Sequence, residues 1–265
     1  MRLLFAGSPQ LALPVLDSLH RTQKVVAVLT NPDRPSGRGG QPRPTPVKAR
    51  ALDLALPVLQ PAELDSAFFA SVRALRCDLL VVAAFGKIFP REFLDLFPLG
   101  GINLHPSLLP RHRGPSPIPA AILAGDGETG VTIQRLAAKM DSGEVLKAVK
   151  VPLAGQETTR VLSQELGRLG AQLLVEAVAD LEAGKIHGVP QDERQATYCR
   201  LVRKEDGRID WSREAVLIER MIRAYDPWPG AYTRFRGRLL HLLAGGVYPE
   251  AVSYTHLRAH ETVLD

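Results

Sequence analysis

Two spacings of apolar residues alternate along the first half of the chain. Short aliphatic runs are typical of buried strands, and they occur at 2–7, 24–30, 56–60, 77–85, 100–105, 130–136 and 144–151. Between them, apolar residues recur at the spacing of an amphipathic helix, at 9–20, 46–55, 63–75 and 90–96. Strands that alternate with helices pair through right-handed crossovers. The pattern therefore predicts a Rossmann-like α/β domain with a mostly parallel sheet.

The second half of the chain follows a different pattern. One long amphipathic helix is predicted over 157–184, and residues 188–210 combine mixed charge with little periodicity. A predicted helix over 213–225 is then followed by a predicted β-hairpin around Arg236 and Gly237. We therefore expect three parts: an α/β domain over 1–190, a linker over 191–212 and the start of a small β domain over 213–250.

Composition and charge narrow the possible functions only a little. No apolar run is long enough to cross a bilayer, and Cys77 and Cys199 lie too far apart in the sequence for a metal-type spacing. These features predict a cytoplasmic protein without a membrane partner. Basic residues gather in two segments, 31–50 and 200–238. Both segments fit binding to a phosphate backbone, but a solvated loop and a solvated linker explain them equally well.

Several common site motifs are absent from the chain. It has no phosphate-binding GxxxxGK[ST] loop, no complete dinucleotide fingerprint, no GxSxG nucleophile elbow and no zinc-type histidine spacing. What remains is NLHPSLLP at 103–110, together with MDSG at 140–143. Asn103 and His105 stand two positions apart on a predicted strand, so their side chains share one face. They also lie at the carboxyl end of that strand, where open α/β sheets usually bind ligands.

Asn103, His105 and Asp141 supply an amide, an imidazole and a carboxylate. Transfer of an acyl group to an amine needs donors for the developing oxyanion and an acceptor for the amine proton. These three groups would meet both needs without a metal or a covalent nucleophile. Taken singly, Asn103 could cap the strand end, His105 could be a half-buried structural histidine and Asp141 could be a turn residue. The combination is much more specific than any one of them.

The stretch INLHPSLLPRHRG (102–114) resembles the signature of the folate-dependent formyltransferases. Other stretches resemble the members of that family that act on methionyl-tRNA, among them FAGSP (5–9), PDRPSGRG (32–39), MDSGEVL (140–146) and IRAYDPWPGAY (222–232). The resemblance implies transfer of the formyl group of 10-formyltetrahydrofolate to the α-amine of initiator methionyl-tRNA. It also implies an enzyme that needs no metal, and we expect a monomer.

The resemblance implies roles for individual residues. Asn103 and protonated His105 would stabilise the oxyanion, while Asp141 would hold His105 in its charged form. Contacts to the folate are implied for Ser107, Leu108, Leu109 and Pro110, and a pterin pocket for Phe85 and Ile88. The loop 31–46 resembles an insertion that contacts the acceptor end of the tRNA, with Arg38, Arg34 and Lys48 as the expected contacts.

The C-terminal part departs from the family pattern. Family members carry a C-terminal β-barrel of the oligonucleotide-binding (OB) type, and here only its first strands are recognisable. We therefore expect an incomplete, truncated OB-like segment. Residues 251–265 have no family counterpart, and we interpret them as a truncated or artefactual end.

Three other functions remain compatible with the residues. The same trio could formylate an amino sugar nucleotide, although the proline-rich basic loop 31–46 argues against that acceptor. It could also hydrolyse formyltetrahydrofolate, with water in place of the amine. A non-catalytic RNA-binding module would use the basic segments alone, and it would leave the set of Asn103, His105 and Asp141 unexplained.

Overall fold

The computed structural model describes residues 1–35 and 41–247. The predicted tRNA contact Arg38 and the predicted tail 251–265 lie outside the described residues. Within them, no helix is both long enough and apolar enough to cross a membrane.

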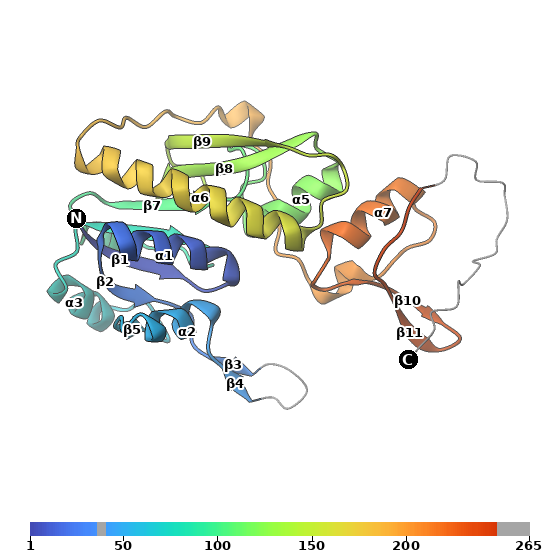
Figure 1. The fold of residues 1–265 in the computed structure, drawn as a ribbon, viewed down its shortest axis with the longest axis horizontal. Coiled ribbons are helices and arrows are strands. Elements are labelled where there is room, and N and C mark those ends of the chain that lie inside the picture. Colours follow the sequence, from blue (N-terminus) through green and yellow to red (C-terminus); the bar gives the residue numbers. More distant parts are fainter. Residues whose placement is uncertain (36–40, 248–265) are drawn as a thin grey trace.

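A seven-stranded sheet forms the centre of the molecule, with the strand order β5-β2-β1-β6-β7-β8-β9 (Figure 1). The five strands from β5 to β7 pair in parallel, and β8 and β9 are added antiparallel at one edge. The prediction of a mostly parallel α/β sheet is thereby confirmed. The strands are β1 (Arg2–Gly7), β2 (Lys24–Leu29), β5 (Val58–Leu59), β6 (Leu79–Ala83), β7 (Gly101–His105), β8 (Glu128–Arg135) and β9 (Val145–Pro152).

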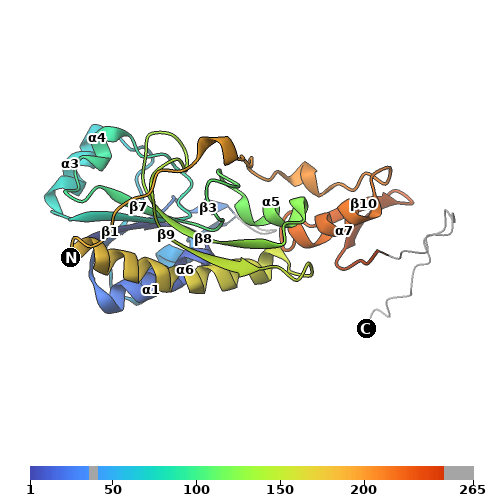
Figure 2. The ribbon, with the colours of Figure 1, turned by 90° about the horizontal axis from the view of Figure 1, so that it is seen from above.

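Alternate residues of the central strands pack into two separate cores, one on each face of the sheet. Leu3 and Phe5 of β1 belong to the larger core, whereas Leu4 and Ala6 of the same strand belong to the smaller one. This follows from the two-residue repeat of a strand. Helices α1 (Leu13–Thr22), α2 (Pro46–Asp53) and α6 (Thr159–Glu182) contribute to the larger core, and α3 (Ser66–Ala74) and α4 (Arg91–Leu94) to the smaller one (Figure 2).

Two local features differ from the expected pattern. The helix predicted from residue 9 opens as a 3-10 turn over Gln10–Ala12 before α1 begins. The helix α5 (Pro117–Ala124) was not predicted at all, because Pro117 and Pro119 suggest a loop. Both prolines fall in the first helical turn, where the amide hydrogens that they lack have no partner within the helix.

The C-terminal part contains α7 (Ala215–Ala224) and an antiparallel hairpin of β10 (Ala231–Phe235) and β11 (Arg238–Leu242). The predicted hairpin turn is confirmed, since Arg236 and Gly237 have φ angles of 48° and 78°. Such angles are typical of two-residue hairpin turns. Helix α7 packs on both sides: Ile218 and Ile222 join a small cluster under the hairpin, and Met221 joins the larger core.

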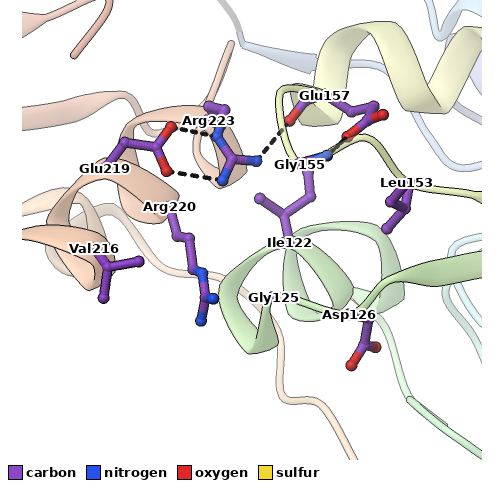
Figure 3. A pocket seen from close by; sticks show the side chains of 10 residues that line it. All are labelled: Ile122, Gly125, Asp126, Leu153, Gly155, Glu157, Val216, Glu219, Arg220 and Arg223. Atoms are coloured by element: carbon purple, nitrogen blue, oxygen red, sulfur yellow. Dashed lines mark hydrogen bonds and ion pairs between the residues drawn. The ribbon is translucent and has the colours of Figure 1, made fainter. Parts of the chain in front are cut away.

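A cavity of about 200 Å³ lies where α7 meets α5 and the loop before α6 (Figure 3). The α7 side of this junction is held by arginines. Arg223 donates to the carbonyl of Glu157 at 3.1 Å and is paired with Glu219, and Arg220 donates to the carbonyl of Ala124 at 3.3 Å. None of Asn103, His105 and Asp141 lines the cavity, so it is not the predicted site.

The segment predicted as a linker lies against the α/β domain. Tyr198 pairs with Arg113 in a parallel bridge, and Val189, two residues before the segment, pairs with Val145 in an antiparallel one. The segment also contains two short 3-10 helices, η2 (Glu193–Gln195) and η3 (Lys204–Gly207). The linker therefore follows the surface of the domain next to the loop after β7.

Candidate active site

The strand β7 orients the first two residues of the predicted trio. It lies between β6 and β8, and it aligns Asn103 with Gln134 and His105 with Thr132 of β8. Residues directly opposite each other in a ladder point to the same face of the sheet. The four polar side chains therefore form one patch at the end of the sheet, and Pro106 follows where β7 ends.

His105 is buried, with 4% of the residue exposed. Its Nε2 lies 2.9 Å from the carbonyl oxygen of His112. Since a carbonyl can only accept, Nε2 must carry the hydrogen. Nδ1 faces Asp141, with 3.6 Å to Oδ1 of that carboxylate, which is too far for a direct hydrogen bond. Nδ1 is therefore the ring nitrogen that can interact with a ligand.

Burial and a carboxylate act on the pKa of His105 in opposite directions. Desolvation of the buried imidazolium lowers the pKa, and it is the larger effect, while the Asp141 carboxylate and the carbonyl of His112 raise it. The neighbouring His112 ring lowers the pKa further. Asp141 is therefore the principal group that favours the charged form of His105.

Asp141 lies in the connection between β8 and β9, as predicted, and its backbone has a φ of 51°. Both carboxylate oxygens are held. Oδ2 accepts from the backbone amide of Gly114 at 2.8 Å, and Oδ1 accepts from the Gln134 side chain, also at 2.8 Å. At Gly143 a Cβ would lie 1.8 Å from the carbonyl oxygen of Arg135. The turn can therefore approach β8 only with a glycine at that position.

The loop predicted to contact folate is fastened to β8 through one threonine. The Thr132 hydroxyl donates to the carbonyl of Ser107 at 2.7 Å and accepts from the amide of Leu109 at 3.1 Å. The Ser107 hydroxyl is buried and donates to the carbonyl of Arg111 at 2.6 Å. The Ser107 side chain is thus engaged inside the loop, whereas Leu108, Leu109 and Pro110 are half-buried.

Phe85 and Ile88, predicted together for a pterin pocket, lie in different surroundings. Phe85 is 2% exposed and stacks on Phe89 with 5.4 Å between the ring centroids. Its carbonyl accepts from the side chain of Asn31 at 2.8 Å. Ile88 is 57% exposed. Of the two side chains, Ile88 is the one accessible to a ligand, and the folate contacts stay predictions.

The described part of the basic loop is anchored near its base. Lys48 forms an ion pair of 2.7 Å with Asp33. The hydrogen bond from the Gln60 amide, and after it this ion pair, lower the pKa of that carboxyl. Arg34 is exposed on β3 (Arg34–Pro35), which pairs with β4 (Pro42–Arg43). Lys48 therefore has an internal partner, while the Arg34 guanidinium lies at the surface.

Comparison with known proteins gives the family of the chain. Residues 1–178 match the formyl transferase family, and residues 201–255 match the formyl transferase C-terminal domain. The chain is 50% identical over 257 residues to a protein of Chloroflexus aggregans named methionyl-tRNA formyltransferase, which covers 96% of this chain and 83% of that protein. The chain belongs to the methionyl-tRNA formyltransferase family. A relative of the same name from Treponema denticola is 43% identical over 95% of the chain and 80% of its own length.

Solved structures of other formyltransferases share the fold. A sugar N-formyltransferase from Shewanella superposes with a TM-score of 0.69 at 19% identity, over 94% of this chain and 99% of that one. HypX from Aquifex aeolicus in complex with tetrahydrofolic acid gives a TM-score of 0.65 at 18% identity, over 91% and 37% of the two chains. At these identities the likeness concerns the fold alone.

Three residues of the site were not predicted. Thr132 and Gln134 stand two positions apart on β8 and face the trio, so the alternation that paired Asn103 with His105 could have revealed them. Gln191 comes from the linker and donates to the carbonyl oxygens of Asp141 and Gly143 at 2.9 and 2.7 Å. No local sequence signal marks Gln191, because its partners lie about fifty residues away along the chain.

Proposed function

We propose that the chain transfers the formyl group of 10-formyltetrahydrofolate to the α-amino group of initiator methionyl-tRNA. The observation that carries the proposal is the 50% identity to a methionyl-tRNA formyltransferase over nearly the whole chain. The convergence of Asn103, His105 and Asp141 at one end of the sheet supports the same chemistry. We infer a soluble enzyme that works as a monomer in the cytoplasm.

In the proposed reaction, the α-amine attacks the formyl carbon and a new C–N bond forms. The carbonyl oxygen becomes an oxyanion, which accepts hydrogen bonds from the Asn103 amide and from protonated Nδ1 of His105. The bond between the formyl carbon and N10 of the folate then breaks. The proton lost by the amine passes, by way of water near Asp141, to N10 of the departing tetrahydrofolate. Neither a metal nor a covalent intermediate is needed.

The surroundings of His105 support these separate roles of His105 and Asp141. Nε2 is occupied by the carbonyl of His112, so the charged ring can direct only its Nδ1 hydrogen toward a substrate. The gap of 3.6 Å between Nδ1 and Asp141 leaves that hydrogen without a direct bond to the carboxylate. Asp141 would thus stabilise the charged ring and leave the Nδ1 hydrogen available to the substrate.

The proposal for the tRNA rests on the basic loop. The exposed Arg34 and the resemblance of residues 31–46 to a tRNA-contacting insertion support a role in holding the acceptor end. We propose Arg38 as the principal contact and Arg34 as a second one. The internal pairing of Lys48 with Asp33 gives Lys48 the role of supporting the loop base.

A transfer assay tests the function directly. Purified protein is mixed with 10-formyltetrahydrofolate and methionyl-tRNA, and formylmethionyl-tRNA is measured, with uncharged tRNA as the control. We expect formylation of the charged tRNA alone. Formylation of an amino sugar nucleotide in place of methionyl-tRNA, or release of formate without any acceptor, would instead support one of the alternative reactions. Tight tRNA binding without any formyl transfer would point to an RNA-binding module.

A further inference from the structure

Gln191 connects the linker to the part of the site that carries Asp141. Its side-chain nitrogen donates to the backbone carbonyl oxygens of Asp141 and Gly143, at 2.9 and 2.7 Å. The same nitrogen lies 3.4 Å from the side-chain oxygen of Gln134, which itself binds the Asp141 carboxylate. One amide therefore joins the backbone of the Asp141 turn to the side chain that fixes its carboxylate.

The other end of the Gln191 amide is held by a buried cation. Its oxygen accepts from Nε and Nη2 of Arg113, at 3.0 and 2.8 Å, and the Arg113 side chain is fully buried. Arg113 is also bound by Glu193 and by the Tyr198 hydroxyl, both from the linker. The amide cannot rotate without breaking these bonds, so its nitrogen is aimed at the Asp141 turn.

The Asp141 turn needs such support. An aspartate with a φ of 51° occupies the left-handed region, which costs energy for a residue with a side chain. The carbonyl oxygens of Asp141 and Gly143 both point to the linker side, where Gln191 supplies hydrogens. Without these bonds the turn could relax toward an unstrained backbone and carry the carboxylate away from His105.

We propose that Gln191 is a positioning residue for formyl transfer, holding the Asp141 turn so that the carboxylate faces Nδ1 of His105. This inference rests on the proposed function, and it adds the linker to the machinery of the site. Gln191 touches neither the trio's reacting atoms nor the predicted folate loop at 107–110. Its effect should therefore fall on kcat and leave the KM for the folate unchanged.

Two substitutions separate positioning from simple support of the fold. Gln191→Glu keeps an acceptor for Arg113 but loses the hydrogens that bind the Asp141 turn, whereas Gln191→Ala loses both sets of bonds. We expect kcat to fall about 10-fold to 100-fold in both variants, as is common when a catalytic group is displaced. We also expect circular dichroism to show that the Glu variant is folded. A Glu variant with wild-type kcat would overturn the proposal, because the bonds to Arg113 would then suffice.

Gln195→Ala is the matched control. Gln195 is exposed, lies in the same segment and donates to the Asp192 carboxylate at 3.0 Å. Its kcat should equal that of the wild type. A similar loss of kcat in the control and in Gln191→Ala would show a general effect of the linker and contradict a specific role of Gln191.

A second readout does not depend on turnover. The pKa of His105, followed by NMR of the imidazole in the full chain, should be lower in Gln191→Ala than in the wild type. The reason is that Asp141 raises this pKa, and the other titratable group against the ring, His112, is unchanged. Identical titrations would contradict the positioning role. If the wild type fails to formylate methionyl-tRNA, the proposed function falls, while this titration still decides the role of Gln191.

Discussion

The loop after β7 and the basic loop 31–46 both carry predicted substrate contacts, but they are held differently. Side chains from other elements bind residues 105–114 along the loop. Thr132 binds two backbone groups of the loop, and Asp126 binds the His112 ring at 2.6 Å. The linker adds Thr197, whose hydroxyl accepts from the amide of His112 at 2.8 Å.

In the basic loop, the described contacts gather at its base. Lys48 pairs with Asp33, and Thr45 shares a hydrogen bond of 2.7 Å with Thr30. The exposed Arg34 points its charge outward from the short β3 strand. The difference matches the two tasks, because a reaction depends on placing atoms to within a fraction of an ångström, whereas charges attract a phosphate backbone over a longer distance.

The largest effect is expected at His105, where β7 ends and the loop begins. His105→Ala removes the proposed Nδ1 donor, and kcat should fall by about 100-fold to 10,000-fold in the transfer assay. Circular dichroism should show a folded protein. His187→Ala, at an exposed position in the segment before the linker, is the control and should keep its activity. Near-normal turnover by His105→Ala would remove the basis for the catalytic trio.

Asp141→Asn should lower the rate less than His105→Ala and should change its pH dependence. If charged His105 is the working form, the rate falls as the pH rises through the pKa of His105. The Asp141 carboxylate raises that pKa, so its loss lowers the pKa and moves the fall in rate to lower pH. The measurement is a single-turnover pH profile of both proteins. A fall at the same or a higher pH would contradict this role.

Gly143→Ala tests whether the geometry of the Asp141 turn matters. The added Cβ would lie 1.8 Å from the carbonyl oxygen of Arg135, so the turn must move, and kcat should fall about 10-fold. Gly127→Ala is a matched control, because no atom lies within 4 Å of its added Cβ. Equal activity of the two variants would mean that the site tolerates a displaced turn.

The smallest effect is expected in the basic loop. Arg38→Ala should raise the KM for methionyl-tRNA modestly and reduce the salt dependence of tRNA binding by about one unit of slope, as expected for the loss of one phosphate contact. Folate binding should not change. Arg21→Ala, at an exposed position of α1, serves as the charge control. An equal loss of folate binding in Arg38→Ala would show that the loop belongs to the folate site.

Local sequence patterns were sufficient to predict where several site residues lie. Alternation along one strand placed Asn103 and His105 on a shared face, and the ladder between β7 and β8 confirms it. The position of Asp141 between two strands was also predicted correctly. The hydrogen bonds that hold these residues in place were not predicted. Gln191 and Arg113, for example, are bonded although they lie 78 residues apart in the sequence, and no motif marks that contact.

Exposure was equally hard to infer from the sequence. Phe85 and Ile88 are close neighbours in the same apolar run, yet one is 2% and the other 57% exposed. Lys48 and Arg34 were assigned the same role, yet Lys48 is paired with Asp33 while Arg34 is exposed. In each pair the residue types suggest the same role, but the packing of neighbouring elements buries or pairs one side chain and leaves the other exposed.

The sequence by itself determined most of the strand and helix order, the family and the three residues proposed for catalysis, since these depend on short periodic patterns and on a local motif. Only the tertiary structure decided which nitrogen of His105 is free, how far it lies from Asp141, and that the linker holds the Asp141 turn through Gln191. The physical reason is that these properties arise from hydrogen bonds between residues far apart in the chain. Such bonds form only when the sheet brings β7, β8 and the linker together.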